Sequence, residues 1–340
     1  MKKQHYQADI AIIGGGIAGI VTALELLNTG KSIALFDRDT EDNFGGLAKE
    51  SFGGMFFIGS PQQKFSGIKD HVDQAKKDWY SFAEFEENEF WGKKWADAFL
   101  ESTQEIYHWL SKRKIKFFPV VHWVERGLFK PGNSVPRFHM VWGTGHGLME
   151  ALIRDLHTHP NKKNLQLHFR HFVQDFQLEQ GKITALEGTN ENTQEHFICN
   201  AGNIVVATGG INGCMEKVRK HWHTDWSRPP ETILNGSHQY SDGAVHDKVS
   251  ALGGNVTHLD LMWNYAAGIP HPYPKRENHG LSLVPPKSAL WLNYKGERIG
   301  PLPLVTSFDT RFLVTKICEQ EKQYSWQVMN RKIAYKELGV

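Results

Sequence analysis

Three glycines near the start of the chain have the spacing of a loop that binds phosphate groups. Gly14, Gly16 and Gly19 form the pattern G-x-G-x-x-G, and Asp37 follows the last glycine by about 20 residues. In such a loop the first glycine permits a sharp turn, the second lets a pyrophosphate approach the backbone, and the third lets a helix pack closely on a strand. An acid at the position of Asp37 can bond ribose hydroxyls, which favours NAD or FAD over NADP.

The elements expected around these residues have the order strand, turn, helix, strand. Residues 8–13 form an apolar run typical of a buried parallel strand, and residues 17–27 predict a helix that ends before Gly30. Residues 32–36 predict the next strand, with Asp37 at its end. We therefore interpret the motif as part of a nucleotide-binding unit, in preference to a glycine-rich turn of an ordinary α/β protein. The motif alone does not distinguish NAD from FAD.

The composition sets limits on the class of protein. The chain has 340 residues, enough for a large core and two domains. Its formal net charge of +2 gives no electrostatic case for binding nucleic acid or an anionic membrane. The three cysteines lie far apart without a CxxC pair, so we expect a reducing, cytoplasmic environment. The sequence shows neither a signal peptide nor an apolar run long enough to span a bilayer.

A second set of glycines follows the acid. Gly45 and Gly46, then Gly53 and Gly54, flank Ser51 in the segment GGLAKESFGGMFF. Glycine lets backbone N–H groups approach a phosphate or a flavin without a Cβ in the way. With DWYSFAEF and NSVPRFH further on, the pattern resembles the FAD-dependent oxidoreductases related to fumarate reductase and succinate dehydrogenase flavoproteins, closest to the branch of predicted FAD-binding dehydrogenases. The resemblance implies that both glycine pairs line the pyrophosphate and the isoalloxazine ring of FAD.

The resemblance also bears on how FAD is attached. Some members of this family link FAD covalently through a histidine shortly before the second glycine pair. Here Leu47 and Ala48 occupy the comparable positions, and the sequence between Glu41 and Met55 contains no histidine. We therefore expect FAD to be bound without a covalent link.

A third glycine motif follows a group of predicted short strands. Residues 164–207 contain five such segments, LQLHFRHFV, QDFQLE, KITALEGT, EHFICN and NIVVAT. They resemble the antiparallel meander of flavoproteins, in which Val173 falls where the backbone holds the adenine. Thr208, Gly209 and Gly210 then resemble the family's second FAD-facing strand. One glycine motif before the meander and another after it, in this order, favour FAD over NAD.

The resemblance implies an α/β architecture with four segments. We expect a Rossmann-like FAD-binding domain, with a central parallel sheet and an antiparallel meander, formed by residues 1–66 and 133–235. Residues 67–132 predict a helical, aromatic-rich insertion, and the helical pattern extends to about residue 126. Residues 236–340 are expected to form an α+β substrate domain, and only part of one.

The substrate region departs from the family's catalytic pattern. The family's G-D-G helix is represented by residues 241–243, with Ser241 able to cap the helix. The histidine that grips the substrate carboxylate is missing, and Trp263 and Tyr265 stand in its place. Core packing is an alternative role for both rings. Fumarate is therefore not the expected substrate, and a bulkier, cyclic or ketone-bearing molecule suits these side chains better.

The expected catalytic groups are the least defined part of the site. Tyr265 can donate or accept a proton. Arg298 is kept from the family's G-x-R turn, and Asp309 and Arg311 lie near the place of the family's arginine acid catalyst without a clear match in register.

The late G-L-Y-A-A-G-E segment of the family, whose helix N-terminus stabilises the reduced flavin, has no counterpart in this sequence. Residues 265–268, YAAG, look similar but stand where the substrate region belongs, and we interpret them as a decoy. We therefore expect the 340 residues to cover only the front part of the family's pattern. Two explanations are open: a truncated product with weak FAD binding and no turnover, or a second polypeptide that supplies the rest.

The leading hypothesis is an FAD-dependent dehydrogenase or reductase that moves hydride between flavin N5 and a carbon next to a carbonyl of a small molecule. Its redox partner is not evident. An NAD-dependent dehydrogenase and a non-catalytic FAD- or ADP-binding remnant are the alternatives. The short histidine pairs lack a third ligand, so no metal is expected. The predicted cofactor-binding residues are Gly14, Gly16, Ala18, Gly19, Asp37, Gly45, Gly46, Ser51, Gly53, Gly54, Val173, Thr208, Gly209 and Gly210, and the predicted catalytic residues are Tyr265, Arg298, Asp309 and Arg311.

Overall fold

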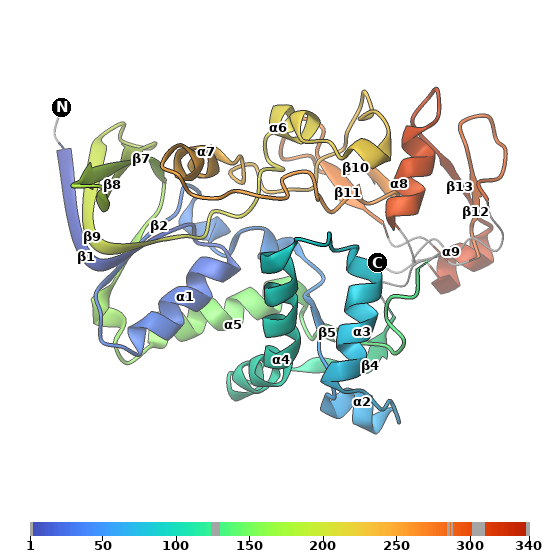
Figure 1. The fold of residues 1–340 in the computed structure, drawn as a ribbon, viewed down its shortest axis with the longest axis horizontal. Coiled ribbons are helices and arrows are strands. Elements are labelled where there is room, and N and C mark those ends of the chain that lie inside the picture. The colour runs from blue at the N-terminus through green and yellow to red at the C-terminus, as the bar shows by residue number, and fades with distance from the viewer. Residues whose placement is uncertain (1–2, 124–129, 284–285, 287, 301–309, 338–340) are drawn as a thin grey trace.

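A six-stranded sheet forms one end of the molecule. The computed structural model describes residues 3–123, 130–283, 286, 288–300 and 310–337. The strand order is β6–β2–β1–β9–β8–β7, in which β6, β2, β1 and β9 are parallel and β9, β8 and β7 are antiparallel. This is the predicted parallel sheet with its meander (Figure 1). The strands are β1 (Lys3–Ile13), β2 (Ile33–Phe36), β6 (Leu165–His168), β7 (His171–Glu179), β8 (Lys182–Asn190) and β9 (His196–Val206).

Two of the predicted strands are one. The segments EHFICN and NIVVAT join into β9, so the prediction of a break between them was wrong. Ala201 and Gly202 stand between the two predicted segments, but β1 pairs with β9 along almost its whole length, from Lys3–His196 to Ile13–Val206. The first half of β9 also pairs with β8. Because β9 belongs to both parts, the meander continues the parallel sheet.

Helices cover both faces of this sheet. On one face lie α1 (Ile17–Leu27) and α5 (Thr144–Thr158), whose apolar side chains share a core with β1 and β2. On the other face, Val245 of α7 (Ala244–Ala251) packs on a cluster that includes Phe36 and Val173. Figure 1 shows α7 on the opposite side of the sheet from α1 and α5. With both faces covered, β2 and the last three residues of β1 are buried, as parallel strands in the middle of a sheet require.

The middle of the chain forms a second lobe. Its helices are α2 (Pro61–Phe65), α3 (Val72–Ala83) and α4 (Phe90–Lys112), and its sheet has the order β3 (Gly54–Phe56), β5 (Phe138–Val141), β4 (Phe117–His122). The helical expectation was therefore wrong over β4, a run of aromatic and β-branched residues that pairs with β5. Arg137 is fully buried in this lobe and bonds Asp70 at 2.8 Å and Asp78 at 2.6 Å.

The remainder of the chain is built from short pieces. Among the described residues, these are two two-stranded sheets, three further α-helices and four 3-10 helices. No helix in the described ranges is both long enough and apolar enough to cross a membrane. The pieces are β10 (Gly268–Pro270), β11 (Gly280–Ser282), β12 (Leu290–Leu292), β13 (Trp326–Val328), α6 (Met215–Lys220), α8 (Thr310–Cys318), α9 (Arg331–Glu337), η1 (Glu41–Asn43), η2 (Gly46–Glu50), η3 (Lys162–Asn164) and η4 (Thr224–Trp226).

Candidate functional site

Three glycine turns meet at the carboxyl ends of β1, β2 and β9. The N–H of Gly14 donates to Phe36 O at 2.8 Å, and the N–H of Ala207 donates to Ile13 O at 2.8 Å. The second turn reaches the first one through the N–H of Gly45, which donates to Gly15 O at 3.0 Å. Three segments far apart in sequence therefore present backbone to one place, the edge of a parallel sheet where nucleotide ligands bind.

The glycines of the first turn have different roles. Gly14 has a φ of +105°, and a Cβ there would collide with the carbonyl of Ala207. A Cβ on Gly19 would collide with the carbonyl of Gly14, so α1 packs on the turn only because this side chain is absent. At Gly16 no atom lies within 4 Å of a built Cβ. That position leaves space in which a ligand can approach the backbone.

A cavity of about 430 Å³ lies over these turns. Its size is within the range of about 300–1,000 Å³ that is usual for small-molecule and cofactor sites. Ten of the predicted cofactor-binding residues line it, which are Gly14, Gly16, Ala18, Asp37, Gly45, Gly46, Val173, Thr208, Gly209 and Gly210.

Asp37 is a partly buried acid on the wall of the cavity. Burial raises the pKa of this carboxyl, and the hydrogen bonds that it accepts oppose the shift only in part. One oxygen accepts from the N–H of Asp39 at 2.7 Å, and the other accepts from the N–H of Gly15 at 2.5 Å. The carboxylate thus lies against the glycine turn with its acceptor atoms at the end of β2.

Several cavity residues were missed by the sequence reading. The guanidinium of Arg38 lies 3.8 Å from the ring centroid of Phe172 and 4.7 Å from that of Tyr240. Among the described residues, the buried atoms without a hydrogen-bond partner include Nδ1 of His246, which was missed, and Oγ1 of Thr208, which was predicted, and both residues line the cavity. Of the missed residues, only Arg38 could have been found from the sequence, by its position next to Asp37. The other missed residues reach the cavity only through the fold.

A family model described as "FAD binding domain" matches residues 9–338. The chain belongs to this family. The recognition of the family and the choice of FAD over NAD are thereby confirmed, and the FAD binding domain family accounts for the cavity's glycine turns and acid.

Two curated relatives are similar along nearly the whole chain. A KsdD-like steroid dehydrogenase of Mycolicibacterium smegmatis is 34% identical, covering 98% of this chain and 63% of the relative. One of Mycobacterium tuberculosis (strain H37Rv) is 35% identical, covering 98% of this chain and 61% of the relative. The chain therefore spans about three fifths of the length of these relatives.

Solved structures of the same fold belong to longer chains. A 3-ketosteroid-Δ4-(5α)-dehydrogenase from Rhodococcus jostii matches with a TM-score of 0.69 and 17% identity, over 99% of this chain and 69% of that one. A flavocytochrome c3 fumarate reductase matches with a TM-score of 0.75 and 17% identity, over 97% of this chain and 54% of that one. These likenesses confirm the predicted fold class.

Four predicted cofactor-binding residues, Gly19, Ser51, Gly53 and Gly54, are not among the described residues that line the cavity. The carbonyl of Ser51 accepts from the N–H of Gly145 at 2.8 Å, at the start of α5. A Cβ on Gly53 would lie 2.8 Å from the same nitrogen. The second glycine pair is thus packed on the start of α5 and on β5, and contact with flavin stays a prediction.

The predicted catalytic residues lie on separate segments. Tyr265 is half-exposed in the loop before β10, with its ring centroid 6.1 Å from that of Trp263. Arg298 is exposed and forms a bridge with Leu292 of β12, and Arg311 on α8 bonds Glu84 at 2.7 Å. The described residues that line the cavity do not include these three, and Asp309 lies outside the described residues.

The expected cap of the G-D-G helix needs a correction. α7 has Gly243 as its N-cap, and Ser241 makes no side-chain cap to it. Asp242 instead accepts a hydrogen bond from the N–H of Ala244 at 2.9 Å. The prediction for Ser241 was wrong because the helix begins two residues later than the sequence pattern suggested.

Proposed function

We propose that this chain holds FAD non-covalently in the 430 Å³ cavity and forms the cofactor-binding part of a flavin-dependent dehydrogenase or reductase. The observation that carries the proposal is the convergence of three glycine turns with Asp37 on one cavity. We propose that the ten predicted residues that line the cavity contact the cofactor. The predicted segments, 1–66 and 133–235 for FAD, 67–132 as the inserted lobe and 236–340 for substrate, remain part of the proposal.

The residues present suit FAD chemically. Gly16 and Gly210 leave their Cβ positions open for a pyrophosphate. Thr208 Oγ1 and His246 Nδ1 are buried polar atoms that a ligand in the cavity can satisfy. Arg38 bonds Glu191 at 2.8 Å and Asp242 at 2.9 Å, so its charge is already used. This leaves no reason to expect that Arg38 serves a 2′-phosphate, and agrees with a ribose that carries free hydroxyls.

The proposed substrate is a polycyclic ketone of the steroid type. The support comes from the KsdD-like relatives and from the Rhodococcus jostii enzyme, whose crystal contains 4-androstene-3,17-dione. When bound, the flavin supplies hydride transfer at N5. For moving the proton we propose Tyr265 first, followed by Arg298, Asp309 and Arg311. The exposed rings of Trp263 and Tyr265 offer flat apolar surface to such a molecule.

A visible spectrum of the purified chain tests cofactor binding. We expect flavin bands that shift when the protein is denatured and a cofactor that separates from the chain, as for non-covalent FAD. A protein that stays colourless when FAD is added contradicts the proposal, and thermal stabilisation by NAD but not FAD would favour an NAD-dependent enzyme. Bound FAD that no steroid reduces would identify a non-catalytic nucleotide-binding module.

Tyr265→Phe tests the proton-moving group. With 4-androstene-3,17-dione and a redox dye as electron acceptor or donor, we expect kcat to fall about 100-fold, the lower range for general acid–base catalysis. Tyr273→Phe is the matched control, because Tyr273 is also exposed and lies in the turn between β10 and β11. An unchanged kcat in Tyr265→Phe removes this residue from the mechanism.

A further inference from the structure

One wall of the cavity comes from a segment far along the chain. We call residues 237–246 the α7 wall, since they lead into and begin α7. The segment faces the end of β2, which carries Asp37 and is the place for a ribose. The α7 wall residues that line the cavity are Ser237, His238, Tyr240, Ser241, Asp242, Gly243, Ala244, Val245 and His246.

Arg38 connects the end of β2 to this wall. Its side chain is 25% exposed, and its guanidinium donates to Asp242 at 2.9 Å and to Glu191 at 2.8 Å. The same guanidinium lies over the rings of Phe172 and Tyr240. Arginine suits this place because a planar cation can stack on aromatic faces and donate at its edge at the same time.

The next residue makes a second connection. Asp39 is buried, and one of its oxygens lies 3.1 Å from Nε2 of His238. The other accepts from the N–H of Thr40 and from the Asn43 amide. Consecutive residues at the end of β2 therefore have separate tasks: Asp37 faces the glycine turn, while Arg38 and Asp39 bind the α7 wall.

We infer that Arg38 and Asp39 are a latch that positions the α7 wall over the adenosine end of the cavity, so that tight nucleotide binding depends on it. The inference rests on the proposed function. It assigns these two residues a positioning role, because their charged groups bond other protein groups and the α7 wall contacts the ligand. The adenosine end is specified by Asp37 and by Val173, which lie beside the latch on the cavity.

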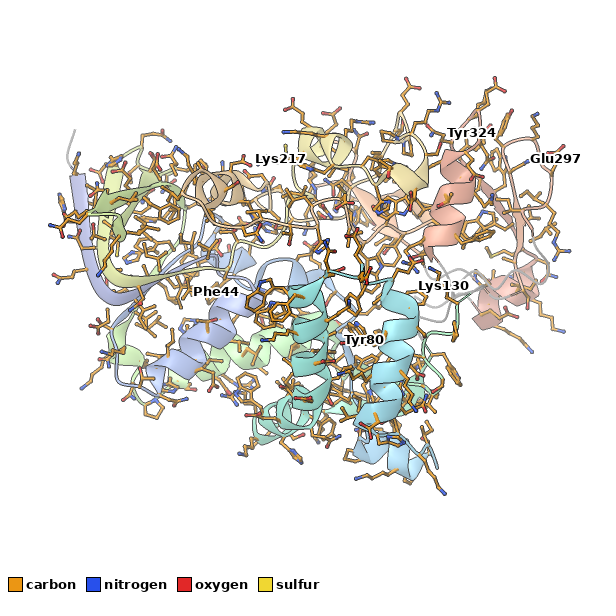
Figure 2. All side chains as sticks on the ribbon, in the orientation of Figure 1. Phe44, Tyr80, Lys130, Lys217, Glu297 and Tyr324 are labelled. Atoms are coloured by element: carbon orange, nitrogen blue, oxygen red, sulfur yellow. The ribbon has the colours of Figure 1, made fainter. Side chains whose placement is uncertain are left out.

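The helix α7, which continues the α7 wall, has other supports that do not depend on the latch. Val245 packs in the core of the sheet, Lys248 bonds Asp175 at 2.8 Å, and Lys217 of α6 bonds Asp247 at 2.6 Å. Lys217 is labelled in Figure 2, close to α7. Loss of the latch should therefore move the start of the wall without unfolding α7, so ligand affinity falls more than stability does.

The experiment compares Arg38→Ala with wild type in titrations of FAD, followed by flavin fluorescence, and of ADP, followed by calorimetry. ADP carries the adenosine half without a flavin. We expect the Kd of both ligands to rise at least tenfold in Arg38→Ala, with Arg38→Lys in between because it restores the charge without the planar fork. The Tm without ligand should fall no further than in the control variant.

Arg113→Ala is that control. Arg113 also stacks on an aromatic ring, Trp109 at 3.4 Å, and pairs with Asp155 at 3.3 Å, but it does not line the 430 Å³ cavity. Equal ADP affinity in Arg38→Ala and Arg113→Ala overturns the latch. If the wild type binds neither FAD nor ADP, the proposed function fails instead.

Asp242→Asn provides a second variant should Arg38→Ala fail to fold. Asparagine keeps an acceptor for the N–H of Ala244 but removes the charge that pairs with Arg38. We expect the Kd for ADP to rise about threefold in Asp242→Asn. In the double variant with Arg38→Lys, the factor by which this Kd rises should be smaller than the product of the two single-variant factors. An unchanged Kd in Asp242→Asn contradicts the inference.

Discussion

The region around the cavity and the region after α7 are stabilised in different ways. The first has a six-stranded sheet with a buried cluster on each face. In the second, the described residues of 252–337 form two two-stranded sheets, and its apolar clusters are small. Two-stranded sheets are marginally stable unless other elements pack on them. The predicted cofactor residues belong mostly to the first region, and the predicted catalytic residues to the second.

This difference explains why one set of residues converges and the other does not. The glycine turns follow strands whose register is set by pairing in the sheet, and this register fixes the positions of the backbone atoms in the turns. Tyr265 and Arg298 lie in or beside loops and short strands, and Arg311 lies at the start of α8. Their positions depend on contacts that local sequence does not specify. Four variants test the contrast.

Gly19→Ala should have the largest effect. A Cβ at this position collides with the carbonyl of Gly14, and backbone cannot move aside as a flexible side chain can. We expect the free energy of unfolding to fall by about 3 kcal/mol or more, the upper end for overpacking. Urea denaturation measures this. Gly202→Ala on β9 is the control, since its Cβ would meet only Asp9 O at 3.4 Å, and equal stability of the two variants would contradict the packing role.

Trp291→Ala should loosen the second region alone. Trp291 is 3% exposed in a cluster with Ala267, Ile299 and Leu313. We expect a loss of about 3 kcal/mol, near the lower end for a buried tryptophan because its Nε1 has no hydrogen-bond partner to lose. Hydrogen exchange should rise in residues 288–300 while the Kd for FAD changes less than twofold. Loss of FAD binding in this variant would show that the two regions unfold as one unit.

Gly16→Ala should weaken the ligand and leave the fold unchanged. Gly16 has a φ of −76°, which alanine adopts, and its Cβ would point into open space. A methyl group there should obstruct a pyrophosphate and raise the Kd for FAD about tenfold or more, or 1.4 kcal/mol. Gly300→Ala in the second region, equally open, is the control. Flavin fluorescence titration and Tm measure both, and unchanged affinity in Gly16→Ala would place the pyrophosphate elsewhere.

Asp37→Asn should lower both stability and affinity, with a stability difference that depends on pH. The folded-state pKa of Asp37 is raised by burial, so its contribution to stability is present below the unfolded pKa of about 3.9 and is lost as pH rises through the folded pKa. The amide has one acceptor oxygen and cannot accept from the N–H groups of both Gly15 and Asp39, so at pH 7 we expect the free energy of unfolding to fall by on the order of 1 kcal/mol, with weaker FAD binding. Urea denaturation between pH 4 and 7 should show this deficit shrink as pH rises, because only the wild type loses stability when Asp37 ionises. A constant difference would contradict a raised pKa.

Much of the cofactor region could be predicted because its information is local. The helix Ile17–Leu27 was predicted with its observed bounds, and Asp37 was placed at the end of a strand. The break within β9 and the helical reading of β4 failed because strand pairing with β1 and β5 overrides local polarity and periodicity. The place of Ser51, against the start of α5, also depends on a partner distant in sequence.

The sequence by itself determined the cofactor chemistry of this protein. Glycine spacing, apolar runs and one acid suffice for that, because a phosphate-binding turn is made from backbone and needs only the absence of Cβ atoms. Tertiary structure alone decided what completes the cavity. Phe172, Tyr240 and His238 reach Arg38 and Asp39 only after the sheet and α7 have packed, since contacts between side chains so far apart leave no periodic signal in the sequence.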